Sequence, residues 1–293
     1  MSQPSISSVL QKCPICEAPA KWRFQKQSIP FYQCSSCKLF FSRPSTNPNW
    51  KEDLNQFEDA YLQYFDDGAV DDVNFRDQWE WLSSHQTIET GKILDIGCGS
   101  GKWVRYLNRI GQGAVGIEPC GALYDRYLKD SADFYSGQLQ DASALRGQKF
   151  DTITCFDVLE HVEDPLRFLG EIKDKLAPNG TLYLSTPNVG SALAKCMGRQ
   201  WHFFCPYHLS LFSARTLVAT TDRLGLQTIN VSHRGRYRSI GYTLGYAWEF
   251  LLRQRRWKPS PMLNDRSWYL NLGDTMYCVL RHASQSNHEL RAA

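Results

Sequence analysis

The chain has 293 residues, 42% of them hydrophobic, which is enough for one large domain with a full core and a small additional module. Its formal net charge of +3 is too small to predict nucleic-acid binding from bulk electrostatics. No apolar run is long enough to span a membrane, and the first residues lack the basic and apolar regions of a signal peptide. We therefore expect a cytoplasmic protein whose ten cysteines are reduced.

Two pairs of cysteines near the N-terminus have the spacing of a structural zinc site. Cys13 and Cys16 form one C-x2-C pair, Cys34 and Cys37 form another, and 17 residues separate the pairs. Such an arrangement presents four thiolates tetrahedrally and leaves no position open for water, so the metal would stabilise a fold and not catalyse. We predict a zinc ribbon over residues 1–44, with two disulfides or redox-active C-x-x-C motifs as the alternatives.

Residues 45–90 are expected to connect the ribbon to a larger domain. Pro44–Asn49 has the composition of a linker. Asn55–Asp67 and Asn74–Glu89 are rich in aromatic residues and are amphipathic at helical spacing. The sequence therefore predicts two helices before the first strand of the larger domain.

A glycine-rich stretch, Ile93–Gly101, marks the first strand of the larger domain, residues 91–293. The sequence ILDIGCGSG predicts a short buried strand, followed by a sharp turn where a ligand can approach the backbone. A dinucleotide fingerprint would need a glycine in place of Lys102, so the spacing is wrong for NAD. Asp95, just before the first glycine, suits a cationic ligand better than a pyrophosphate. Without a ligand, the stretch would be an ordinary strand-to-helix turn.

These nine residues resemble the first motif of class I S-adenosylmethionine (SAM) methyltransferases, an apolar pair, an acid and then G-x-G-x-G. The resemblance implies an α/β fold with a doubly wound, Rossmann-like seven-stranded sheet and an antiparallel last strand, in addition to the zinc ribbon. It implies SAM contacts from the acid and the glycines: Asp95, Gly97, Gly99 and Gly101. In such enzymes helices before the first strand cover the cofactor. Three aromatic residues of the first predicted helix would then form either a lid or core contacts: Tyr61, Tyr64 and Phe65.

The next two strands are predicted at residues 114–117 and 133–136. Glu118 follows the first of them, where an acid can hold both hydroxyls of a ribose by paired hydrogen bonds. Taken alone, Glu118 would be a solvated surface acid. The family pattern places its adenine contact after the following strand, at Gln138 and Leu139, which match that pattern loosely.

The fourth predicted strand, Asp151–Phe156, leads into the polar run DVLEHVEDP. This segment resembles one found in small-molecule methyltransferases of the ubiquinone-biosynthesis type, where an acid-rich loop and then E-H close over the methionine end of SAM. The resemblance implies that Phe156 and Asp157 border the cofactor. It also implies that Glu160 and His161 face the methyl group or the substrate. His161 could accept a proton from a hydroxyl nucleophile, or the E-H pair could be only a hydrogen-bonded helix start.

The chain beyond the fifth predicted strand should determine which acceptor is used. Trp201–Leu217 combines a tryptophan, P-x-H-L and a following helix, and is similar to a segment of bacterial methyltransferases of polysaccharide and secondary-metabolite pathways. We predict His208 as the catalytic base, ahead of His161, with a buried structural histidine as the alternative. Two aromatic side chains are expected to line the acceptor-binding site: Trp201 and Tyr207.

The last two strands are predicted within Leu226–Arg236 and Thr275–Ala283, as a hairpin whose final strand is antiparallel to the rest of the sheet. An insertion at about 235–272 is predicted to cap the substrate. Within it, residues 239–258 are apolar on nearly every face before a basic end. We interpret this segment as a buried cap, a dimer helix or an interfacial helix on anionic lipid, in that order of preference.

These patterns predict a SAM-dependent methyltransferase that acts on a small-molecule acceptor, at a hydroxyl of a sugar, polysaccharide or secondary-metabolite intermediate. The first alternative is an RNA methyltransferase that holds nucleic acid through its ribbon. The segment from Cys13 to Lys38, however, has no basic run and only four basic residues: Lys21, Arg23, Lys26 and Lys38. We therefore expect no nucleic-acid partner. The second alternative, a non-catalytic scaffold with the same fold, is disfavoured by the intact glycine loop.

Overall fold

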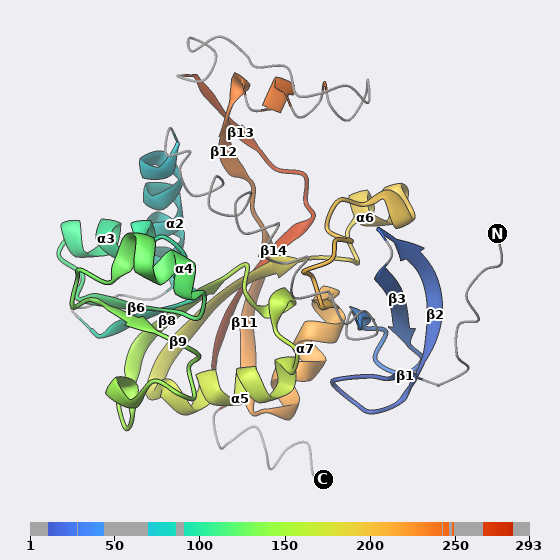
Figure 1. The fold of residues 1–293 in the computed structure, drawn as a ribbon, viewed down its shortest axis with the longest axis horizontal. Helices are drawn as coiled ribbons and strands as arrows, with labels where there is room; N and C mark the ends of the chain where they lie inside the picture. The colour runs from blue at the N-terminus through green and yellow to red at the C-terminus, as the bar shows by residue number, and fades with distance from the viewer. Residues whose placement is uncertain are drawn as a thin grey trace.

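The structure is a computed structural model, shown in Figure 1. It describes residues 11–27, 29–43, 70–85, 91–241, 243–245, 248 and 266–283. The predicted linker Pro44–Asn49, the aromatic residues Tyr61, Tyr64 and Phe65, and most of the apolar segment 239–258 lie outside these residues.

A seven-stranded sheet forms the centre of the larger part of the chain. Its strands are β5 (Ile93–Ile96), β6 (Ala114–Glu118), β7 (Phe134–Ser136), β8 (Phe150–Phe156), β9 (Leu176–Pro187), β11 (Leu226–His233) and β14 (Thr275–His282). Their spatial order is β11-β14-β9-β8-β5-β6-β7, and β14 is antiparallel to both of its neighbours. The predicted doubly wound sheet with an antiparallel last strand is therefore confirmed. Because β5 pairs with both β6 and β8, its carboxyl end lies where the strand order reverses, which is where such sheets bind ligands.

Helices cover both faces of this sheet (Figure 1). On the two faces lie α2 (Asp71–His85), α3 (Lys102–Arg109), α4 (Gly121–Leu123), α5 (Pro165–Lys175) and α7 (Ala214–Arg223), whereas α6 (Ala192–Met197) lies beside the ribbon strands. The short helical turns are η2 (Tyr124–Leu128), η3 (Ser143–Leu145), η4 (Leu159–His161) and η5 (Gly198–Gln200). One hydrophobic cluster holds Leu82 of α2 and Leu107 of α3. A second holds Ile172 of α5 and Leu217 of α7. None of the helices in the described ranges is both long and apolar enough to cross a membrane.

Strand β5 is buried on both faces, as expected for a parallel strand with helices on either side. Ile93 packs in the cluster with α2 and α3, whereas Leu94 and Ile96 pack in the cluster with α5 and α7. Asp95 is the one polar residue of this strand. Helix α3 begins at Lys102, directly after the glycine loop, as the sequence predicts.

Two helices begin at side chains that cap their N-termini. Asp164 accepts a hydrogen bond from the backbone N–H of Arg167 at the start of α5. Ser213 accepts one from the N–H of Thr216 at the start of α7. Residues 177–180 lie within β9, between Leu176, which is opposite Phe150, and Thr181, which is opposite Thr152, where the pairing with β8 shifts register.

The cysteine-containing segment folds as a small antiparallel sheet that also includes a strand from the larger part of the chain. Its strands are β1 (Gln11–Lys12), β2 (Pro19–Lys26), β3 (Ile29–Cys34), β4 (Phe40–Ser42) and β10 (Ser210–Leu211), in that spatial order. Ser210 of β10 lies opposite Phe41 of β4. Behind this sheet, Phe31 and Trp201 share one hydrophobic cluster. The ribbon is thus joined to the larger domain by main-chain pairing as well as by packing.

A second, smaller sheet follows β11. Strands β12 (Arg236–Ser239) and β13 (Ser267–Leu270) pair antiparallel and project away from the main sheet (Figure 1). They fall within the insertion predicted as a substrate cap. Trp268 and Tyr269 on β13 are exposed. That role for the insertion stays a prediction.

Candidate active site

The glycine loop turns between β5 and α3 through left-handed residues. Gly97, Gly99 and Gly101 have φ of +71°, +56° and +74°. Residues with a side chain enter this region at a cost of about 1–2 kcal/mol. A Cβ on Gly97 would lie 2.5 Å from Val158 Cγ2, and one on Gly101 would lie 2.6 Å from Leu128 Cδ2. The loop therefore needs glycine for both its conformation and its packing, and a ligand can approach its bare backbone closely.

Glu118, at the end of β6, is hydrogen-bonded to the glycine loop. Its carboxylate accepts hydrogen bonds from the backbone N–H groups of Gly99 and Cys120, each over 2.8 Å. The residue is only 4% exposed. Burial raises the pKa of this carboxyl, and the two N–H donors oppose that rise. The donors fix the carboxylate beside the loop and leave lone pairs for a pair of ligand hydroxyls.

Asp95 is buried beneath the loop. It accepts a hydrogen bond from Thr154 Oγ1 on β8 over 2.7 Å. Burial raises its pKa to about 7, the Thr154 bond lowers it, and the nearby Glu118 adds to the rise. At the end of β8, the Phe156 ring lies 6.5 Å from the Trp103 ring of α3. A buried acid with so high a pKa is stabilised in its ionised form by a cationic ligand, which fits the sulfonium of SAM.

The two residues expected beside an adenine have different surroundings. Gln138 is exposed, and its side-chain oxygen accepts a hydrogen bond from Gln140 Nε2 over 2.6 Å. Leu139 is buried in the core. Gly137 donates its N–H to the Glu118 carbonyl oxygen over 3.0 Å, so this turn lies beside Glu118. The adenine contact stays a prediction for both residues.

Asp157, the first residue after β8, has φ of +56°, which is uncommon for a residue with a side chain. Its carboxylate accepts a hydrogen bond from Ser185 Oγ over 2.7 Å and forms an ion pair with Arg236. Burial alone would raise the pKa of Asp157, but the Arg236 guanidinium and the Ser185 hydroxyl lower it. No local pattern in the sequence indicated Arg236, because it lies 79 residues from Asp157 along the chain.

Glu160 and His161 lie on the turn η4, next to Val158, which contacts the glycine loop. Glu160 is 1% exposed and accepts a hydrogen bond from Thr186 Oγ1 over 2.9 Å. Burial, with a contribution from the carboxylate of Asp157, raises the pKa of Glu160 to about 8. His161 Nδ1 lies within hydrogen-bond distance of a backbone carbonyl oxygen. Loss of water around the His161 ring lowers its pKa.

His208 lies against His161, so the structure brings the two predicted catalytic histidines together. Their ring centroids are 4.8 Å apart. His208 is 6% exposed, and its Nδ1 lies 2.9 Å from the Phe203 carbonyl oxygen. Burial, with a contribution from His161, lowers the pKa of His208 to about 3. A ring with so low a pKa is a weak proton acceptor, so its surroundings give little support to the predicted role of general base.

The two aromatic side chains expected to wall the acceptor lie apart in the fold. Trp201 is fully buried, and its Nε1 donates to Asp274 over 3.0 Å. The expectation for Trp201 is therefore wrong, because it packs against Phe204 beneath the ribbon. Tyr207 is exposed, and its ring centroid is 6.0 Å from that of His161. Of the two, Tyr207 is the one that can border an acceptor.

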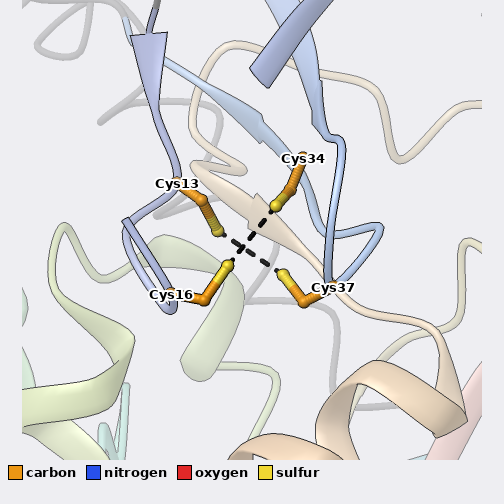
Figure 2. Close-up of side chains that lie close together, drawn as sticks. All are labelled: Cys13, Cys16, Cys34 and Cys37. Atoms are coloured by element: carbon orange, nitrogen blue, oxygen red, sulfur yellow. Dashed lines mark hydrogen bonds between the residues drawn. The ribbon is translucent and has the colours of Figure 1, made fainter. Parts of the chain in front are cut away.

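The four cysteines of the ribbon converge, as Figure 2 shows. The sulfurs of Cys13 and Cys37 are 3.5 Å apart, as are those of Cys16 and Cys34, and all four lie within 4.8 Å of one another. Sulfurs in a disulfide are about 2.0 Å apart, so these are thiols, while a tetrahedral zinc with bonds of about 2.3 Å spaces them by about 3.8 Å. The residues directly after Cys16 and Cys37 have positive φ, as expected for two tight knuckles. The donor set fits a structural zinc.

Three comparisons with known proteins agree with this geometry. Residues 75–231, more than half of the chain, match the methyltransferase domain family. A ubiquinone biosynthesis O-methyltransferase of Xanthomonas campestris pv. campestris (strain B100) is 29% identical over 115 residues, 37% of this chain and 48% of that protein. The chain therefore spans about half the length of the curated relatives it matches.

Two solved structures share the fold. One is a chain of the complex between the Haloferax volcanii Trm112 methyltransferase activator and a methyltransferase, with a TM-score of 0.51, 15% identity, and coverage of 82% of this chain and 96% of that one. The other is a SAM-dependent methyltransferase from Clostridium acetobutylicum ATCC 824, with a TM-score of 0.50, 9% identity, and coverage of 79% and 99%. Together with the family match, the fold and the glycine-loop sequence identify the chain as a member of the methyltransferase domain family, in its class I SAM-dependent group.

Proposed function

We propose that this protein transfers a methyl group from SAM to an oxygen of a small-molecule acceptor, a hydroxyl of a sugar, polysaccharide or secondary-metabolite intermediate. The observation that carries the proposal is the convergence of the glycine loop, Glu118 and the turn η4 at the carboxyl edge of the sheet. The names of the curated relatives, O-methyltransferases of ubiquinone biosynthesis, support oxygen as the accepting atom.

Residues around the glycine loop would hold the cofactor. When bound, SAM would supply an electrophilic methyl carbon: its bond to sulfur would break as a bond to the acceptor oxygen forms, S-adenosylhomocysteine would leave, and the hydroxyl proton would pass to solvent. Glu118 is oriented by two N–H donors to accept hydrogen bonds from ribose hydroxyls. Asp95 supplies negative charge beneath the cationic end, and Asp157 borders the methionine end. Because the methyl transfer itself needs only an aligned nucleophile, positioning of both ligands contributes most of the catalysis.

The ribbon gives little support to an RNA acceptor. Two of the four basic residues between Cys13 and Lys38 are engaged within the protein: Lys26 Nζ donates to the Trp201 carbonyl oxygen over 2.8 Å, and Lys38 Nζ to that of Ser35 over 2.7 Å. Burial also lowers the pKa of Lys26. Phosphate binding by counterion release needs several free cationic side chains on one face. A small acceptor fits better.

On the acceptor side, we place His161, His208 and Tyr207. The environment lowers the pKa of both histidines, so neither ring is protonated at neutral pH and neither is a strong base. The deep burial of His208 argues against the predicted ranking of His208 ahead of His161 as the base. Their shared role is to bind or orient the acceptor.

The test combines SAM binding with acceptor screening. Calorimetry should show one SAM site per chain, and Gly99→Arg, which places a long cationic side chain in the loop, should abolish it. Normal SAM affinity in that variant would refute the cofactor assignment. Formation of S-adenosylhomocysteine is then measured with a panel of hydroxylated sugars, phenols and unmodified RNA. Turnover with RNA alone, with binding that weakens steeply with salt, would instead support the nucleic-acid alternative.

A further inference from the structure

Glu160, His161 and His208 form a second group of metal-binding side chains, separate from the ribbon cysteines. One donor atom from each of the three lies within 4.8 Å of the others. Glu160 and His161 are adjacent on η4, and His208 precedes β10. The backbone N–H of Leu209 donates to the Glu160 carbonyl oxygen over 2.7 Å, which holds the two segments together.

Hydrogen bonds fix the tautomer of both histidines. His161 Nδ1 lies 3.0 Å from the Tyr207 carbonyl oxygen, and His208 Nδ1 lies 2.9 Å from that of Phe203. A carbonyl oxygen can only accept, so Nδ1 carries the proton in each ring. When the rings are neutral, Nε2 in each therefore presents a lone pair. Metal-binding histidines commonly donate their other N–H to a backbone carbonyl in this way.

A bound cation would stabilise the ionised form of the Glu160 carboxyl. Glu160 is almost fully buried, and a buried ionised carboxylate is costly unless it is paired with a cation. Within the described ranges, no lysine or arginine forms a salt bridge with Glu160. The nearby Arg236 instead forms its ion pair with Asp157. A cation held between Glu160 and the two imidazoles would satisfy all three groups.

The spacing allows such a cation after small side-chain movements. Ligand atoms about 2.1 Å from a metal lie about 3.0–3.4 Å apart in octahedral or tetrahedral geometry. The donor atoms are at most 4.8 Å apart, and they would reach this shorter spacing by rotation of side chains that lie on a turn and a loop. Two imidazoles and one carboxylate, with further positions open, suit Mn²⁺, Fe²⁺ or Zn²⁺. The ribbon is different, because four thiolates select zinc and leave no open position.

We propose that Glu160, His161 and His208 bind one divalent transition-metal cation, whose open positions take oxygen atoms of the acceptor. The second half of this proposal rests on the proposed function, since it needs an acceptor next to η4. Both histidines then serve as neutral ligands through Nε2. A metal site would account for the placement of the two histidine rings side by side next to the cofactor loop.

The experiment uses the full chain with its ribbon zinc retained and Mn²⁺ as the probe, because thiolate sites bind Mn²⁺ poorly. Protein is titrated with MnCl₂ while the electron paramagnetic resonance signal of free Mn²⁺ is followed. We expect one Mn²⁺ per chain. His161→Ala and the isosteric Glu160→Gln should each weaken binding by at least about tenfold. The matched control is His202→Ala, a partly exposed histidine of the same segment that lies 3.7 Å from Asp274 and outside the group.

Two results would overturn the metal site. One is Mn²⁺ binding that His161→Ala and Glu160→Gln leave unchanged, since the cation would then lie elsewhere. The other is a wild-type protein that takes up no Mn²⁺ and, after dialysis against Zn²⁺, contains only the ribbon zinc. SAM calorimetry on the same samples separates the two proposals. Normal SAM binding without a second metal refutes the metal site alone, whereas Mn²⁺ binding without SAM binding supports the metal site and refutes the proposed function.

Discussion

The carbonyl oxygen of Leu209 accepts a hydrogen bond from the backbone N–H of Ser42 over 3.0 Å, while the N–H of Leu209 donates to Glu160 over 2.7 Å. Ser42 ends ribbon strand β4, and Glu160 lies on the turn beside the glycine loop. A continuous path of main-chain bonds therefore runs from the ribbon to the acceptor side of the site. Thr216 Oγ1 adds a second link, because it donates to the Cys37 carbonyl oxygen over 2.9 Å.

We predict from this relationship that loss of the ribbon metal impairs the active site as well as the ribbon. Cys34→Ser should remove the zinc and destabilise the protein by about 3 kcal/mol or more, because structural zinc contributes folding free energy directly. The melting temperature should fall by roughly 6–12 °C. Turnover with an acceptor from the panel should fall with it, because Leu209 and Glu160 lose their support.

Cys196→Ser is the matched control, since Cys196 is an exposed thiol outside the ribbon. Metal content, melting temperature and turnover should all match the wild type in that variant. If Cys34→Ser loses its zinc but keeps full turnover below its melting temperature, the ribbon is an independent module and the main-chain path has no functional role.

Glu118 gives a prediction about the cofactor alone. Glu118→Gln should weaken SAM binding by about 10–100-fold, since a hydrogen bond to a charged group contributes about 1.5–3 kcal/mol. The physical reason is that both carboxylate oxygens accept from backbone N–H groups, and an amide nitrogen in place of one oxygen would face a donor. Calorimetry measures the effect. Glu171→Gln, on α5, where the carboxylate forms an ion pair with Arg167, is the control and should bind SAM normally.

The central sheet and the glycine loop could be predicted from the sequence because their signals are local. The stretch Ile93–Ile96 is mostly apolar, and Asp151–Phe156 is rich in β-branched and apolar residues. The observed strands agree with these stretches to within one residue. The three glycines fix the loop by conformations that other residues rarely adopt. The spacing of the four ribbon cysteines likewise predicts that their thiols lie together, as they do in the structure.

The acceptor side could not be predicted in the same way, because its contacts join distant parts of the chain. Strand β10 has only two residues, too few for any periodicity, and it exists because Ser210 pairs with Phe41 of the ribbon. That pairing places Trp201 under the ribbon and so overturned its expected role as an acceptor wall. The Arg236–Asp157 ion pair is equally non-local. Local propensity carries no information about such pairs.

Gly97 links the cofactor loop to the turn η4, which gives a rescue experiment. A Cβ at Gly97 would lie 2.5 Å from Val158 Cγ2, so Gly97→Ala should displace Val158 as well as strain the backbone. We expect a loss of about 2–4 kcal/mol of stability, of which about 1–2 kcal/mol is the conformational cost. The double variant Gly97→Ala/Val158→Ala lacks the Val158 methyl groups that would clash with the new Cβ. It should therefore lose less stability than the sum of the losses in the two single variants. Strictly additive melting data would show that the two residues do not couple.

Asp95 gives a prediction about pH. Its pKa is raised to about 7 in the folded protein, mainly by burial, whereas the unfolded chain releases this proton near pH 4. The folded state therefore holds the extra proton, and the stability of the ligand-free protein falls as pH rises from about 4 to about 7. The full cost of ionising the buried acid, on the order of 4 kcal/mol, is present at pH 8. Asp95→Asn, which keeps an oxygen for Thr154, should thus raise the melting temperature at pH 8 and change it little at pH 4.

Ionisation of Asp95 should also govern the affinity for SAM, but in the opposite direction to stability. The cationic ligand binds more tightly when Asp95 is charged, whereas the ligand-free protein is less stable in that state. Binding should strengthen by about tenfold between pH 6 and pH 8, since below its pKa the acid must first lose a proton. SAM itself titrates in this range, so the decisive quantity is the difference between wild type and Asp95→Asn at each pH. We expect the variant to bind more weakly and to lack the tenfold dependence. Parallel pH profiles for the two proteins, measured by calorimetry, would mean that Asp95 stays ionised throughout and that its burial is offset by contacts other than Thr154.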